Sequence, residues 1–296
     1  MVIRAALVVL LIAIGVPFGR GPAPMYSDIP TEPSIEEIGF PAPNPPDEHI
    51  WQEKLPLATA EKDLAAQTLA VARSFLGTPY VHGTLDHAAS EQLTVNLREL
   101  DCWTFVENSL GIALSARIPN PAYDTLQKYV QQLRYWGGMV NGYASRIHYF
   151  SGWLLQAEKL GYLRDITREL GGVPYRKHIG YMSARPQKYP ALRDPDARRV
   201  MTQVEERVSQ HHWFYIPQQR VAQMEHLIHE GDIIALTSAK RDLDIAHQGF
   251  AVRRNGRVYL LHASSLGRRV ILAAQPLAKY VLAQKGQTGI MVARLQ

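Results

Sequence analysis

Apolar side chains repeat at helical spacing in four stretches of the first 160 residues. Trp103, Val106 and Leu110, for example, share one face of the second stretch. The first stretch begins near Thr59, a residue type that caps helices, and a glycine or proline follows each of the four. The pattern predicts helices over residues 59–76, 101–118, 122–136 and 153–160.

From Gly231 onward the period changes to that of strands, with many β-branched residues. Asn255-Gly256 lies between two such runs and indicates a two-residue hairpin, because both residue types tolerate a positive φ. Helices followed by an antiparallel meander are typical of an α+β fold. The predicted strands cover residues 232–236, 246–253, 257–263, 269–273 and 289–295.

Two other segments show neither period. Residues 24–58 are rich in proline, which favours a linker or an extended arm. Residues 162–230 are irregular and polar-aromatic, with short helical stretches near 198–208 and 218–229. A long irregular segment inside a domain more often carries a function than serves only as a connection. We therefore expect one domain over residues 59–296 with an insertion at 162–230.

The N-terminus has the pattern of a secretory signal. A short basic start ending at Arg4 precedes an uncharged run from Ala5 to Phe18, and Gly21-Pro-Ala23 fits a cleavage site. An uncleaved membrane anchor is the alternative, but the run is short for a span of ~30 Å. We expect residues 1–23 to be removed, leaving a periplasmic or secreted protein without a stable membrane span.

Composition limits the class of protein further. Of the 296 residues, 46% are hydrophobic and 20% are charged, which excludes wholesale disorder. The net charge of +5 is spread thinly and no run of five basic residues exists, so nucleic acid is not the expected partner. The charge is compatible with an anionic polymer such as a cell wall.

Cys102 is the single cysteine, so an internal disulfide framework and a multi-cysteine metal site are excluded. It lies in the first turn of the helix predicted over 101–118, where free backbone N–H groups favour a thiolate. The alternative is a buried thiol that acts as a small hydrophobe. A free thiol is a liability in an exported protein unless it is buried or useful.

The predicted hairpin places two histidines together. With a two-residue turn, residue 249 faces residue 262, so His247 and His262 become diagonal neighbours on one face, roughly 7–8 Å apart at the backbone. Gly249 and Ala251 share that face, and we expect the Cys102 helix to pack against these small residues. The pairing permits a chain in which His247 polarises Cys102 and His262 orients His247.

At this point the chain resembles the NlpC-like, papain-fold cell-wall cysteine hydrolases. More narrowly, it resembles their N-acetylmuramoyl-L-alanine amidase-like branch. The superfamily motifs occur in order as Gly77-Thr-Pro-Tyr80, Leu100-Asp-Cys102-Trp, Gly231-Asp-Ile-Ile, His247-Gln-Gly-Phe and Leu261-His262-Ala-Ser-Ser265. The branch motifs are Arg146-Ile-His-Tyr149, Trp153, Met182-Ser183 and His262-Ala-Ser-Ser265.

The resemblance implies a papain-like core, in which the nucleophile helix packs on an antiparallel sheet of about five strands. It makes Cys102 the nucleophile, His247 the general base and His262 the third, orienting residue. Tyr80 would help to position substrate or oxyanion. Asp101 reads a free peptide amine in the superfamily's endopeptidases, and its role in an amidase stays open. Four further residues would line the substrate groove: Arg146, His148, Tyr149 and Ser264.

The function implied by the resemblance is hydrolysis of the amide between N-acetylmuramic acid and L-alanine, without a cofactor. Small muropeptides, including anhydro forms, would be the substrates, and residues 162–230 would line the groove that selects them. The alternative within the superfamily is an endopeptidase that cuts inside the stem peptide.

Two other classes of protein compete with a cysteine hydrolase. A zinc amidase could use histidines as ligands, although no His-Glu-x-x-His motif is present. The candidates are His226 with His229, the neighbours His211 and His212, and the pair His247 and His262. A non-catalytic glycan-binding module could use the five tryptophans and 14 tyrosines for stacking on sugars.

Overall fold

The computed structural model describes residues 45–86 and 90–296 of the chain. The expected signal peptide and the first part of the expected linker, residues 24–44, lie outside these ranges. No helix within them is both long and apolar enough to cross a membrane.

The end of the expected linker is a helix rather than an extended arm. Helix α1 spans Pro45–Thr59, with Asp47 and Glu48 in its first turn, where the helix dipole favours acidic side chains. Trp51 is buried, and its indole N–H donates to the hydroxyl of Ser115. Proline in a first turn is compatible with a helix, so the prolines at 45 and 46 were not evidence against one. Among the described residues, those of α1 therefore pack with the rest of the chain, although they precede the expected boundary at 59.

The predicted helices are present with adjusted ends. Helix α2 starts after Asp63, whose side chain accepts from the backbone N–H of Ala66, so Thr59 ends α1 instead of capping α2. The helices of the first half are α2 (Leu64–Ser74), α3 (Cys102–Ser115), α4 (Tyr123–Arg134) and α5 (Phe150–Lys159). Later in the chain follow α6 (Pro195–Gln210), α7 (Val221–Met224) and α8 (Leu277–Ala283).

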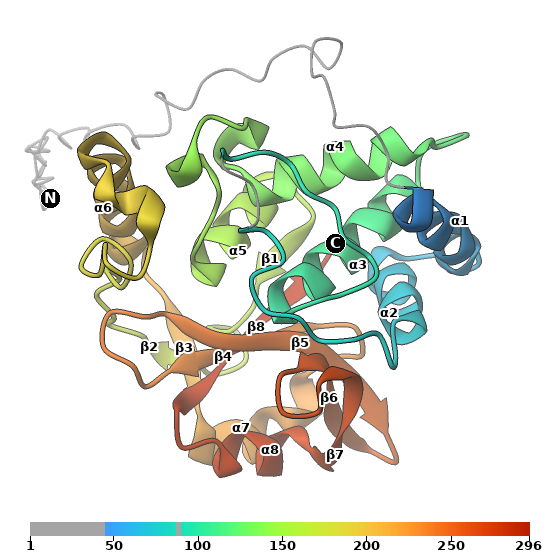
Figure 1. Cartoon of the computed structure of the whole chain (residues 1–296). Coiled ribbons are helices and arrows are strands. Elements are labelled where there is room, and N and C mark those ends of the chain that lie inside the picture. Colours follow the sequence, from blue (N-terminus) through green and yellow to red (C-terminus); the bar gives the residue numbers. More distant parts are fainter. Residues whose placement is uncertain (1–44, 87–89) are drawn as a thin grey trace, which may run out of the picture. The chain divides into compact units, whose positions relative to one another are not determined.

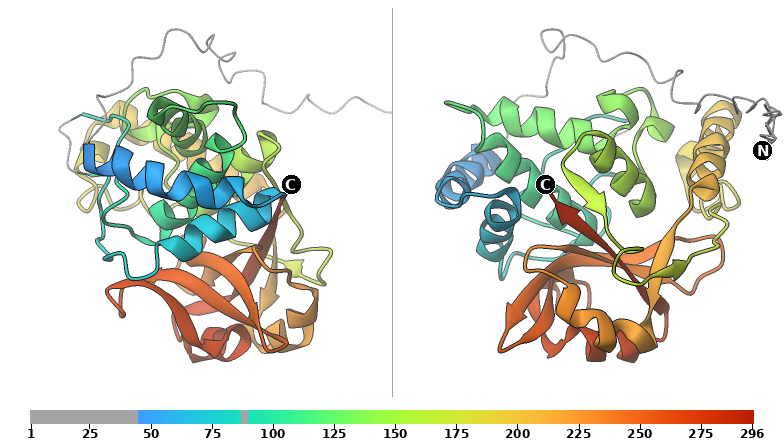
Figure 2. Two further views of the ribbon diagram at one scale, coloured as in Figure 1. Left: turned by 90° about the vertical axis from the view of Figure 1, so that its right-hand side faces the viewer. Right: turned by 180° about the vertical axis from the view of Figure 1, so that it is seen from behind.

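The described residues form one antiparallel sheet of eight strands rather than about five. All five predicted strands are present: β4 (Ile233–Ser238), β5 (Ile245–Arg254), β6 (Arg257–Ser264), β7 (Arg269–Pro276) and β8 (Gln287–Leu295). The order is β2-β3-β8-β4-β5-β6-β7, with β1 also paired to β8. Figure 2 shows β8 in dark red, inside the sheet although it comes last in the chain.

The three additional strands come from the segment expected to be an irregular insertion. They are β1 (Leu163–Asp165), β2 (Val173–Pro174) and β3 (Phe214–Pro217), and both β1 and β3 pair directly with β8. Runs of two to four residues are too short to show a period of two, so the sequence pattern could not reveal them. Residues 162–230 are thus partly built into the sheet.

Helices cover both faces of the sheet, with α1–α5 above it and α7 and α8 below it in Figure 1. Phe250 of β5 packs edge-on against Phe105 of α3, at 5.5 Å between ring centroids. Ala251 belongs to the other face, with Val281 of α8. Helix α3, which begins at Cys102, therefore packs on the large apolar side chains of β5. The expectation that it packs on the Gly249/Ala251 face is wrong.

Candidate active site

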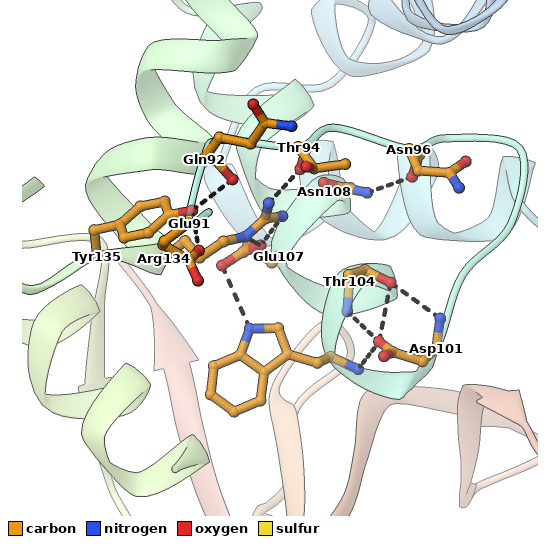
Figure 3. A network of polar contacts seen from close by, with 11 residues as sticks. Glu91, Gln92, Thr94, Asn96, Asp101, Thr104, Glu107, Asn108, Arg134 and Tyr135 are labelled. Atoms are coloured by element: carbon orange, nitrogen blue, oxygen red, sulfur yellow. Dashed lines mark hydrogen bonds and ion pairs between the residues drawn. The ribbon is translucent and has the colours of Figure 1, made fainter. Parts of the chain in front are cut away.

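Cys102 is the first residue of α3, as predicted, and Asp101 caps this helix. The Asp101 carboxylate accepts from the backbone N–H groups of Trp103 and Thr104 at 3.0 and 2.8 Å. The Thr104 hydroxyl accepts from the Asp101 N–H at 3.0 Å, which completes a capping box (Figure 3). Local sequence therefore positions the thiol at the start of a well-defined helix.

The thiol is protonated at neutral pH. Burial, and then the Asp101 carboxylate, raise the pKa of Cys102 to about 12, and the backbone N–H groups of Gln248, Cys102 and Trp103 only partly oppose this. The backbone N–H groups at the helix start lower the thiol pKa, as expected, but by less than desolvation raises it. The expected resting thiolate is therefore not what the structure supports.

Two phenols flank the thiol. Tyr80 lies in a segment held on both sides, because its N–H donates to Arg268 O and the next N–H, of Val81, donates to Leu100 O. Burial, and then the Cys102 and Asp101 charges, raise the pKa of Tyr80 to about 12, so its hydroxyl is a hydrogen-bond donor at neutral pH. Tyr280 of α8 is the second phenol, and both burial and Cys102 raise its pKa. The sequence pattern did not single out Tyr280, since the seven-residue helix α8 was not predicted.

The predicted histidine pair is present. His247 Nε2 and His262 Nδ1 are 2.6 Å apart, and the rings are nearly perpendicular. Burial and the neighbouring His262 lower the pKa of His247 to about 3, and burial lowers the pKa of His262 to about 4. Both imidazoles are therefore neutral near pH 7, so His247 is available as a base. The thiol interacts with the backbone N–H of Gln248, the residue that follows His247.

Gly249 allows the two strands to approach closely at this pair. A Cβ atom at position 249 would lie 2.4 Å from Leu261 O and 2.9 Å from the Cβ of His262. The hairpin that sets the register has Asn255 and Gly256 at φ values of 51° and 75°, as the two-residue turn requires. Register and close approach together bring the two imidazoles into hydrogen-bond contact.

The four residues expected in the substrate groove are engaged within the protein. Arg146 pairs with Asp86 and Glu91, and the ring of His148 contacts Tyr143 O through Nε2. The other two are also buried: Tyr149 donates to Glu205 at 2.5 Å, and Ser264 accepts from the N–H of Gly267. Glu205 of α6 also accepts from the N–H groups of Met182 and Ser183. Contact of these four with substrate stays a prediction.

A buried ion pair joins α3 to α4, and the sequence pattern did not reveal it. Glu107 of α3 accepts from Arg134 Nε and Nη2 at 2.8 and 2.5 Å, and both side chains are at most 1% exposed. Arg134 also donates to Thr94 O, and the Trp103 indole N–H donates to Glu107 at 3.4 Å (Figure 3). Their spacing of 27 residues carries no motif, so only the fold could bring them together.

Within the described ranges, no group of three or more His, Cys, Asp or Glu side chains is arranged to hold a metal ion. Of the histidines considered for zinc, His247 and His262 contact each other, His211 packs against the ring of Trp213, and His229 contacts Asp232 through its backbone N–H.

Fold and site together define an α+β protein with a cysteine at a helix start and a histidine pair on the neighbouring strands β5 and β6. Residues 70–290 match the model of the N-acetylmuramoyl-L-alanine amidase-like family. The chain therefore belongs to this family.

Solved structures agree with this assignment. The chain resembles an N-acetylmuramoyl-L-alanine amidase from Bacteroides uniformis at 32% identity and a TM-score of 0.74, covering 79% of this chain and 99% of that one. A Bacteroides fragilis protein described as a candidate xylanase is similar at 34% identity and a TM-score of 0.71, covering 75% and 98%. A Legionella pneumophila protein at 20% identity and a TM-score of 0.67, covering 85% and 94%, shares the fold. A comparison with curated proteins found no match.

Proposed function

We propose that this protein is a cysteine-dependent N-acetylmuramoyl-L-alanine amidase that acts on small muropeptides, including anhydro forms, after export to the periplasm or beyond. Cys102 would be its nucleophile, and it would need no cofactor. The observation that carries the proposal is the neutral, hydrogen-bonded pair His247–His262, in which His247 lies on β5 directly before Gln248, whose N–H interacts with the Cys102 thiol. Family membership and the resemblance to the Bacteroides uniformis amidase support the choice of bond.

The chemistry follows from the protonation states. Because the thiol is neutral, His247 takes its proton as the sulfur attacks the amide carbonyl. The Cys102 backbone N–H and the protonated hydroxyl of Tyr80 are donors for the tetrahedral oxyanion, and each such donor typically contributes about 10²–10³ in rate. His247 then protonates the leaving amine of L-alanine, and water hydrolyses the thioester.

The proposal is tested by digesting purified muropeptides with wild type, Cys102→Ser and His247→Gln. Mass spectrometry should show free L-alanine-terminated peptides with wild type and a loss of at least about 10³-fold in turnover with both variants. His229→Gln serves as the matched control, because His229 is exposed and far along the chain from the pair.

Four outcomes would contradict the proposal in distinguishable ways. Cleavage within the stem peptide would indicate an endopeptidase. Loss of activity with EDTA or in His229→Gln, together with resistance to thiol alkylation, would indicate a zinc enzyme. Release of reducing sugar from xylan without muropeptide cleavage would indicate a glycosidase. Unchanged sugar binding with no turnover by any form would indicate a binding module.

A further inference from the structure

A polar surface cavity, wide open to solvent, lies where the loop between β4 and β5 meets the segment that precedes α6. Its volume is about 470 Å³, and its lining residues are Lys177, His178, Arg241 and Asp242. Three of the four side chains are basic. None of these residues belongs to the site described above.

Main-chain contacts fix the shape of this cavity. The Lys177 ammonium donates to Ser238 O at 3.0 Å and to Lys240 O at 2.6 Å, which ties the loop to residue 177. The N–H of Gly180 donates to Asp242 O at 3.0 Å. Because these bonds join the segment at 177–180 to the loop at 238–242, the residues that carry the basic side chains are brought beside one another.

The positive charges around the cavity are only loosely neutralised. Asp242 is the one lining carboxylate, and it lies 3.3 Å from His178 Nδ1. Its distances to Arg241 Nε and Arg185 Nη2 are 3.7 and 3.9 Å, longer than hydrogen bonds. Both guanidinium groups therefore keep donors free, and the Arg241 side chain is 92% exposed. Planar donors of this kind match a carboxylate group.

The cavity is also within reach of the candidate active site. His247 is the third residue of β5 and lies five positions after Asp242, an extended span of at most about 18 Å. Asp244, in the same loop, accepts from the N–H and hydroxyl of Ser151 at the start of α5. A substrate peptide of a few residues can cover such a distance.

We propose that this cavity binds a carboxylate of the substrate's acidic stem peptide, with Arg241 and Lys177 as the contacting cations. The inference rests on the proposed function and deepens it. In this proposal, residues 177–178 and 241–242 recognise the negative charge of the stem peptide. Muropeptides with acidic stems are therefore the favoured substrates.

The first test compares two muropeptides that differ only in their stem, one with free carboxylates and one with these groups amidated. In the full-length protein, Arg241→Gln should raise KM for the free-carboxylate substrate about three- to tenfold, the effect of losing one partly solvated charge-assisted contact. The wild-type preference for the acidic substrate over its amide should disappear. The matched control is Arg254→Gln, an exposed arginine at the opposite, hairpin end of β5. This control should keep the wild-type preference.

The second test separates this proposal from the proposed function. Calorimetry would measure binding of synthetic L-Ala-γ-D-Glu-L-Lys and of its amidated form to wild type, Arg241→Gln and Arg254→Gln, without any turnover. Tighter binding of the acidic peptide that Arg241→Gln alone abolishes supports the cavity, even if a different bond is cleaved. Equal binding of the two peptides by wild type, or equal losses for both in Arg241→Gln, would overturn it.

Discussion

Asp101 affects the thiol in two opposite ways. As the N-cap of α3 it holds the helix start that presents Cys102, through bonds to two backbone N–H groups. As a carboxylate beside the sulfur it raises the pKa of the thiol. The resemblance left its role in an amidase open, and the structure assigns it a capping role. The sequence predicted the position of Cys102 correctly, but not its protonation state, because desolvation depends on tertiary packing that no local motif encodes.

Asp101→Asn should separate these two effects. Asparagine caps helices about as well as aspartate, but it carries no charge, so the thiol pKa should fall. The rate of inactivation by iodoacetamide, measured from pH 6 to 10, should reach a given value at a lower pH than in wild type. Asp101→Ala is the comparison, because it should also lose about 1 kcal/mol of stability with the cap. Superimposable profiles for wild type and Asp101→Asn would contradict the electrostatic effect.

Among the elements, those with a strong local signal could be predicted from the sequence. The Asn255-Gly256 turn determined the register that pairs Phe250 with Leu261, and from it followed the contact between His247 and His262. The short strands β1–β3 and helix α8 depend on tertiary pairing and could not be found. The prediction for α3 was wrong because the small residues Gly249 and Ala251 suggested that the helix packs against their face of the sheet. The helix instead packs on the opposite face, where Phe105 contacts Phe250.

The pair Glu107–Arg134 joins α3, α4 and the strand-like segment near Thr94. Glu107→Gln should destabilise the protein by roughly 3–5 kcal/mol, because it leaves the Arg134 charge buried without its counter-ion. Urea denaturation followed by tryptophan fluorescence would measure this change. The double variant Glu107→Leu/Arg134→Met removes both charges and should recover much of the loss. A double variant as unstable as the single one would show that the pair is not the cause.

For the molecule as a whole, three histidines with lowered pKa values set the response to acid. Burial, with a contribution from Arg146, lowers the pKa of His148 to about 3, alongside the lowered values of His247 and His262. The unfolded chain takes up protons on these residues below about pH 6.5, whereas the folded protein does not until pH 3–4. The unfolded state thus binds more protons, and acid favours it.

Stability should therefore decline as the pH falls from 6.5 to 4. Each such histidine contributes about 1.4 kcal/mol per pH unit in this window. Melting temperatures measured across it should fall steeply for wild type and less steeply for His148→Gln, which removes one titrating group. His229→Gln should retain the wild-type slope. A flat wild-type curve between pH 6.5 and 4 would contradict the neutral, buried state of these rings.

The hydrogen bond between His247 and His262 has a direction, and that direction decides whether the pair can act as a base. His262 is only 2% exposed and its Nε2 has no hydrogen-bond partner, while the ring of Tyr280 lies 5.4 Å away at 66°. If the shared proton sits on His247 Nε2, His247 keeps a bare Nδ1, and His262 must carry its own proton on Nε2. Tyr280 is the aromatic neighbour of His262, and an aromatic ring is a weak acceptor for such an N–H. In this tautomer the Nδ1 of His247 is free to accept the thiol proton, so the position of the one shared proton determines which of the two rings can serve as the base.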